Sequence, residues 1–128
     1  MLTLTIKKKW FDMIMSGEKK EEYREIKPYY DSRFRHVWQR SFVGGKAPRK
    51  IRFRNGYSAD SPSFIAACTL DVGEGQPEWG AEPGKQYYRL HILSVNNEKD
   101  PKWFKLVNES INEYEEVNQA DIIEKFDF

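Results

Sequence analysis

A change of hydrophobic period near the N-terminus is the feature that most constrains this fold. Leu2, Leu4 and Ile6 alternate with threonine residues, and this period of two predicts a half-buried strand. The next segment, KKKWFDMIMSG, carries apolar residues three and four positions apart, which predicts an amphipathic helix that ends at Gly17 in a left-handed conformation. A strand that passes directly into a helix indicates a chain that combines both kinds of element.

Short strand patterns and turn residues continue along the rest of the chain. After Gly17 a charged strand is expected, and Pro28 should end it because proline restricts the residue before it. The pair Asn55-Gly56 predicts a tight turn. The further expected elements are a helix over Tyr29–Arg40, strands over Ile51–Arg54, Phe64–Val72 and Tyr87–Val95, a Gly/Pro loop over Gly73–Lys85, a helix from Asp100-Pro101 through Tyr114, and a last helical turn over Asp121–Phe126.

This order of elements defines the expected fold class. Hairpin turns between the later strands favour a mixed or antiparallel sheet. Closing such a sheet removes its exposed edges. The sequence therefore predicts an α+β fold, a small mixed or antiparallel β-barrel flanked by two or three helices. The length of 128 residues and the absence of a linker pattern predict one domain over residues 1–128.

Composition excludes several classes of protein. The aromatic content of 15% rules out a disordered chain, although 32% of the residues are charged. No apolar run reaches the roughly 20 residues of a membrane span. The N-terminus lacks the pattern of a secretory signal, so we expect a cytoplasmic protein with no membrane partner. Cys68, the single cysteine, is expected in the core, and with only two histidines, in different elements, we expect no metal site and no cofactor.

Charge is distributed unevenly, although the net charge is only +1. The window from Ser32 to Ala59 holds eight basic and no acidic residues, whereas the segment from Glu98 to Phe128 holds nine acidic and four basic residues. This separation predicts either a positive surface that attracts phosphates or two halves that neutralise each other within the fold.

The charged stretch SGEKKEEYR, from Ser16 to Arg24, is the candidate for a site. Alternate side chains of a strand share a face, so Glu22 and Arg24 should lie together, with Lys20 and Ile26 on that side. Lys19 has the opposite parity and joins the same site only if it lies in the turn after Gly17. The alternative is a structural Glu22–Arg24 salt bridge with Lys19 in solvent.

The spacing Gly17-x-Lys19-x-x-Glu22-x-Arg24 resembles the GxKxxExR motif of the ASCH domains, a branch of the PUA-like β-barrel superfamily. The N-terminal strand and helix, the Asn-Gly-Tyr segment from Asn55 and the Trp-Gly pair near residue 80 extend the resemblance over nearly the whole chain. It implies a barrel with a cleft beside the first helix, lined by the motif residues. ASCH domains are generally proposed to bind RNA or nucleotides.

One group of similar domains consists of enzymes that hydrolyse the acetyl amide of N4-acetylcytidine with a lysine, a threonine and a distant glutamate. Lys19 matches that lysine. Glu22 stands in the place of the threonine, and a carboxylate does not replace a hydroxyl nucleophile. The resemblance therefore supports the family more strongly than it supports this reaction.

Three functions remain open from the sequence. The first is an RNA- or modified-nucleotide-binding protein, with arginines meeting phosphates and rings stacking on bases. The second is a small hydrolase, acting on an acylated nucleoside or on RNA, in which Lys19 is base or nucleophile and Glu22 a general acid/base. The third is a protein-binding module built on an acidic C-terminal helix face with Glu109, Glu113 and Glu116.

The candidate ligand-binding residues combine the motif with basic and aromatic positions elsewhere. Trp79, in its Gly-rich loop, is expected either as a lid over the cleft or as a plug at one end of the barrel. The full set is Lys19, Glu22, Arg24, Tyr23, Arg33, Arg52, Arg54, Asn55, Tyr57 and Trp79.

Overall fold

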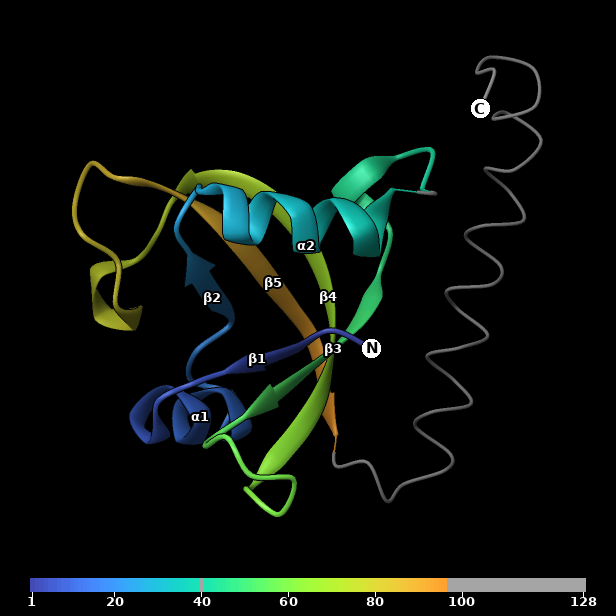
Figure 1. Ribbon diagram of the computed structural model, residues 1–128. Helices are drawn as coiled ribbons and strands as arrows, with labels where there is room; N and C mark the ends of the chain where they lie inside the picture. The colour runs from blue at the N-terminus through green and yellow to red at the C-terminus, as the bar shows by residue number, and fades with distance from the viewer. Residues whose placement is uncertain (40, 97–128) are drawn as a thin grey trace.

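The computed structural model describes residues 1–39 and 41–96 (Figure 1). Within these residues two α-helices accompany five strands, which confirms the predicted α+β class. The elements are β1 (Thr3–Thr5), α1 (Lys8–Met15), β2 (Glu21–Arg24), α2 (Pro28–Trp38), the short 3₁₀ helix η1 (Gly44–Lys46), β3 (Arg49–Arg54), β4 (Ser63–Glu74), the 3₁₀ helix η2 (Pro77–Trp79) and β5 (Gln86–Asn96).

The five strands form one mixed sheet in the order β1-β3-β4-β5-β2. β1 runs parallel to β3, and the other neighbouring pairs are antiparallel. The sheet curls strongly into a half-barrel (Figure 1). A mixed or antiparallel sheet was predicted, and the sheet is mixed. The described strands leave β1 and β2 as its two edges, so the expected closure of the barrel is incomplete. The open side of the half-barrel between the edge strands β1 and β2 is the seam.

The apolar core lies on the inner face of the half-barrel. Ile51 and Phe53 are fully buried and alternate with half-exposed Arg52 and Arg54, as the period of two predicted for this strand. The Phe53 ring lies 5.3 Å from the ring of Phe64, between centroids. Phe53 and its neighbours therefore fix β3 against β4.

Helix α2 covers part of this core and passes over the sheet in Figure 1. Phe34 is buried and packs edge-on against Tyr88, with ring centroids 5.0 Å apart. Trp38 is also buried, and its Nε1 donates to the Ala47 carbonyl at 2.7 Å. The side chain of Trp38 is therefore a core residue and is not available for stacking on a base. Cys68 is fully buried in the core as predicted, and burial raises the pKa of its thiol.

Two turn predictions differ from the structure. β2 ends at Arg24, and Pro28 instead stands in the first turn of α2, where its fixed φ suits a helix and its missing N–H costs nothing. The tight turn expected at Asn55-Gly56 is wrong, because residues 55–62 all lie between β3 and β4. Asn55 instead begins this longer loop, and its Nδ2 donates to the Ile6 carbonyl at 2.9 Å.

The predicted C-terminal helix from Asp100 through Tyr114, its acidic face and the turn over Asp121–Phe126 lie outside the described residues, as does Arg40 at the predicted end of the second helix. None of the helices within the described part of the chain has the length and apolar character needed to cross a membrane.

The core predicts a contrast between two leucines of the same strand. Leu90 is fully buried, whereas Leu93 is 57% exposed. Leu90→Ala leaves a cavity and is expected to lower the free energy of unfolding by about 2–5 kcal/mol. Leu93→Ala is expected to change it by about 0.5 kcal/mol or less. Urea denaturation of both variants measures the difference, and equal losses would contradict this assignment of the core.

Candidate functional site

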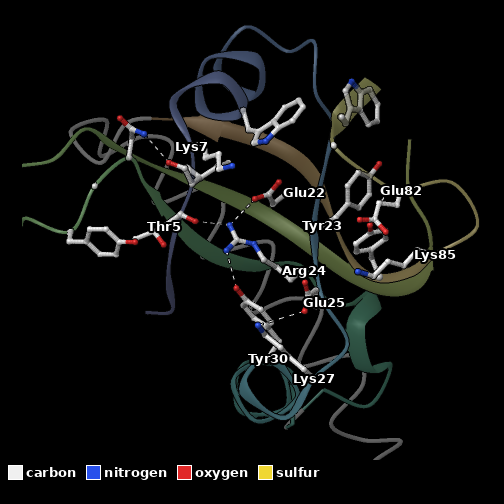
Figure 2. A pocket seen from close by; sticks show the side chains of 18 residues that line it. Thr5, Lys7, Glu22, Tyr23, Arg24, Glu25, Lys27, Tyr30, Glu82 and Lys85 are labelled. Atoms are coloured by element: carbon white, nitrogen blue, oxygen red, sulfur yellow. Dashed lines mark hydrogen bonds and ion pairs between the residues drawn. The ribbon is translucent and has the colours of Figure 1, made fainter. Parts of the chain in front are cut away.

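A cleft of about 740 Å³ lies along the seam of the half-barrel (Figure 2). Its walls come from both edges of the sheet, from both helices, from the loop after β3 and from the loop between β4 and β5. The lining residues are Thr5, Ile6, Lys7, Trp10, Glu22, Tyr23, Arg24, Glu25, Lys27, Tyr30, Asn55, Gly56, Tyr57, Trp79, Gly80, Glu82, Lys85 and Tyr87. The cleft therefore exists because the sheet is not closed.

A buried carboxylate between two cations forms the floor of this cleft. Glu22 is only 6% exposed. Its Oε1 lies 3.2 Å from Lys19 Nζ, and its Oε2 lies 2.7 Å from Arg24 Nη2. Because a carboxylate is costly to bury without partners, this arrangement makes each of the three groups depend on the others.

The turn after α1 brings Lys19 to this carboxylate, as the parity of the strand required. Gly17 has φ +83°, the left-handed value that follows a helix C-terminus. Lys19 then donates its backbone N–H to the Met13 carbonyl at 2.9 Å, before β2 begins at Glu21. The condition that strand parity set is therefore met, and Lys19 joins Glu22 and Arg24 from the turn.

Lys19 is enclosed, so the alternative of a solvated lysine is wrong. The residue is 1% exposed, and its Nζ donates to the Trp79 carbonyl at 2.5 Å. The same nitrogen lies 4.6 Å from the centroid of the Trp10 ring and 5.0 Å from that of Tyr23. Burial lowers the pKa of the Lys19 ammonium, and the neighbouring charge of Glu22 opposes that shift.

Arg24 bridges the seam between the two edge strands. Its Nη2 donates to the Thr5 carbonyl at 2.8 Å, and its Nη1 donates to the Tyr30 hydroxyl at 3.3 Å. Figure 2 shows this guanidinium between Glu22 and Tyr30. The Nε of Arg24 is buried with no hydrogen-bond partner among the described residues. One side chain of β2 thus links β1, α2 and the buried carboxylate.

Aromatic rings and lysines complete the walls and the mouth. Lys27 lies 3.7 Å from the carboxylate of Glu25, and its Nζ is 5.5 Å from the centroid of the Tyr30 ring. Lys85 is similarly placed 5.2 Å from the centroid of Tyr87. Tyr57, at the mouth, is 92% exposed. A planar ligand with an anionic group matches these flat rings and cationic ends.

The structure divides the predicted site residues into two groups. Those that line the cleft are Glu22, Tyr23, Arg24, Asn55, Tyr57 and Trp79. Lys19 lies behind its wall. Arg33 stays on α2, where its guanidinium packs 3.4 Å from the centroid of the Tyr29 ring. Arg52 and Arg54 lie on the face of β3 opposite its buried residues and do not line the cleft. Trp79 is one of the residues that line the cleft, and its expected role as a lid or as a plug stays a prediction.

Several lining residues were not predicted as site residues. They are Thr5, Ile6, Lys7, Trp10, Glu25, Lys27, Tyr30, Gly56, Gly80, Glu82, Lys85 and Tyr87. They come from segments that are distant in sequence, and no local pattern joins them. Gly80 belongs to the Trp-Gly pair noted in the sequence. In the structure a Cβ at this position would lie 3.0 Å from the Trp10 ring, so the pair marks where the loop packs on α1.

Neither a metal site among the described residues nor a comparison with known proteins assigns a function to this cleft. Within residues 1–39 and 41–96 no group of three or more His, Cys, Asp or Glu side chains is placed to hold a metal ion. On the outer face of the sheet His91 Nε2 lies 2.8 Å from Asp71 Oδ1, and Arg89 pairs with the same carboxylate. No protein-family model, curated protein or solved structure matches the chain. What this protein does is therefore inferred from its own residues.

The bridge across the seam predicts that Arg24 is essential for stability. Arg24→Met leaves Glu22 buried with one cation and removes the donor to Thr5, so the free energy of unfolding should fall by about 3–5 kcal/mol. The exposed pair of Lys8 and Asp12, 2.6 Å apart, is the control. Lys8→Met should cost about 0.5 kcal/mol or less. Urea denaturation compares the variants, and equal effects would show that the bridge is dispensable.

Proposed function

We propose that this chain is a small ASCH-domain protein that binds RNA or a modified nucleotide in the seam cleft. The motif resemblance supports the family, since Lys19, Glu22 and Arg24 meet directly behind the helix that precedes them. The observation that carries the function is the cleft itself. It combines the Glu22–Arg24 pair on its floor with aromatic rings on its walls and lysines at its mouth.

The rings supply the affinity expected for a base. Six aromatic side chains contribute to the lining, and they are Trp10, Tyr23, Tyr30, Tyr57, Trp79 and Tyr87. Stacking of a base on an aromatic side chain contributes about 1–3 kcal/mol and tolerates every base because each has a π-face. A ligand with a flat ring is therefore favoured over a flexible acyclic one.

The polar groups supply orientation. A carboxylate has about four lone-pair sites, so Glu22 retains acceptor capacity beside its two cations. It can accept a hydrogen bond from an amino group of a base. The amide nitrogen of Asn55 donates to the Ile6 carbonyl, so its amide oxygen is the atom that can accept a hydrogen bond from a ligand. Lys7, Lys27 and Lys85 line the same cleft and suit a phosphate attached to the base.

Binding in the cleft predicts that removing the exposed ring of Tyr57 lowers the affinity for the ligand. Tyr57→Ala removes a stacking surface at the mouth without disturbing the core, so it should weaken binding by about 1–3 kcal/mol at unchanged stability. Leu93→Ala, an exposed apolar truncation outside the cleft, should leave affinity unchanged. The probes are 5′-mononucleotides and a short single-stranded RNA, titrated by tryptophan fluorescence at several salt concentrations. RNA affinity should fall as salt rises, in proportion to the phosphates contacted.

The proposal fails if no probe binds, or if RNA affinity is independent of salt. It also fails if Tyr57→Ala and Leu93→Ala behave alike. A binding mode confined to the outer arginines of β3 would give this last result, because those side chains are not part of the cleft.

Hydrolysis is the second candidate function, and one observation favours it. Burial lowers the pKa of Lys19, and a lysine base or nucleophile requires that direction of shift. Against it, Lys19 Nζ is enclosed by Trp10, Tyr23 and the Trp79 carbonyl, and position 22 offers no hydroxyl. Binding is therefore the better-supported function. The protein-binding alternative depends on the predicted C-terminal helix with Glu109, Glu113 and Glu116, and these residues lie outside the described part of the chain.

Turnover distinguishes hydrolysis from binding. Acylated nucleosides and short RNAs are incubated with the protein, and products are read by mass spectrometry. A hydrolase would give product that disappears in Glu22→Gln, whereas a binding protein leaves every substrate intact.

A further inference from the structure

We infer that Lys19 acts as a positioning residue that never touches the ligand and that joins the β4–β5 loop, residues 75–85, to the carboxylate of Glu22. The effect on ligand affinity rests on the binding function proposed above. The mechanical link between the loop and Glu22 does not, because it follows from contacts within the protein.

The position of the Lys19 ammonium excludes a direct contact. Its side chain has no exposed surface, and the residue is not part of the cleft lining. The two rings nearest to its Nζ, those of Trp10 and Tyr23, do line the cleft. A ligand that stacks on these rings therefore meets their faces and edges, while the ammonium stays enclosed next to them.

One nitrogen satisfies acceptors from two distant segments. Lys19 Nζ donates to the Trp79 carbonyl at the end of η2 and pairs with Glu22 of β2. Trp79 and Lys19 are 60 positions apart in the sequence. Without the ammonium, the Trp79 carbonyl loses its donor and the carboxylate keeps only Arg24. Unpaired buried polar groups are costly, so both acceptors would move toward other partners.

The loop is seated on the same residues that enclose Lys19. Gly80 has φ +102° and packs so closely on Trp10 that an added Cβ would come within 3.0 Å of its ring. Gln76 donates its backbone N–H to the Tyr23 hydroxyl at 2.8 Å. The loop in turn contributes Trp79, Gly80, Glu82 and Lys85 to the cleft. Lys19 therefore holds one wall of the cleft at a fixed place relative to its charged floor.

This link makes a prediction that a merely structural lysine does not make. Glu22 and the loop are joined through Lys19, so removing the charge of Glu22 should loosen the loop. Loosening is read from hydrogen exchange of the backbone amides of Trp79, Gly80 and Ala81, which donate to carbonyls inside the loop. The exchange of core amides in β4 provides the internal reference.

The experiment compares Lys19→Met, Glu22→Gln and the double variant with wild type. Lys20→Met is the matched control, because Lys20 is the adjacent lysine, is exposed and lies outside the cleft. We expect the three loop amides to exchange about tenfold faster or more in Lys19→Met. Glu22→Gln should accelerate the same amides, the double variant should exchange like Lys19→Met alone, and Lys20→Met should match wild type.

Affinity for 5′-mononucleotides and a short single-stranded RNA is measured on the same proteins. Lys19→Met and Glu22→Gln should each weaken binding, and their effects should not add, because both act on one linked unit. Additive losses, or unchanged affinity in folded Lys19→Met, would refute the positioning role for the ligand.

The two proposals fail in different ways. If wild type binds no probe, the binding function is wrong, whereas loop exchange still tests the link. If loop exchange in Glu22→Gln equals that of wild type, the link is absent whatever binds. This second measurement also decides the case in which Lys19→Met does not fold, since Glu22→Gln has nearly the same size as glutamate, removes its charge and keeps one of its two acceptor oxygens.

Discussion

The buried carboxylate of Glu22, held between the cations of Lys19 and Arg24, is the interaction on which the rest of the structure depends. Taking three charges out of water is costly, and their mutual attraction offsets this only when the geometry is close. Distances of 3.2 Å and 2.7 Å meet that condition. Through Lys19 the carboxylate reaches the β4–β5 loop, and through Arg24 it reaches β1. Segments that share no main-chain pairing are thus joined by side chains.

Side-chain contacts, and not backbone hydrogen bonds, connect β1 with β2, and this explains why a cleft is present. A closed barrel would pair β1 with β2 and fill the space between them, whereas here Arg24 spans the seam at the Thr5 carbonyl and leaves the rest open. The floor of the cleft is charged but internally paired, and the rings around it are apolar. Such a surface combines flat rings with cationic side chains, and this combination is the basis of the binding function proposed above.

Local patterns predicted part of this site and missed the rest for a physical reason. The parity of the strand placed Glu22 and Arg24 together and showed that Lys19 could join them only from the turn after Gly17, because parity is a property of neighbouring residues. It did not decide between that position and a solvated Lys19. Asn55 shows the limit of such patterns. The Asn-Gly pair favours a tight turn, but in the structure Asn55 begins a longer loop and its side chain donates to the Ile6 carbonyl, 49 positions away. The outward direction of Arg52 and Arg54 was predicted from their alternation with Ile51 and Phe53, yet alternation does not say which surface is the cleft.

The sequence alone determined the mixed α and β character, the order of the elements, the inward face of β3 and the common face of Glu22 and Arg24, since hydrophobic period and side-chain parity act over a few residues. Only the tertiary structure decided that the sheet stays open between β1 and β2 and that Lys19 is sealed behind Trp10 and Tyr23. It also decided that residues from both helices and two loops share one cleft. Those outcomes depend on how strongly the sheet curls and which distant segments it brings together, and no short stretch of sequence contains that information.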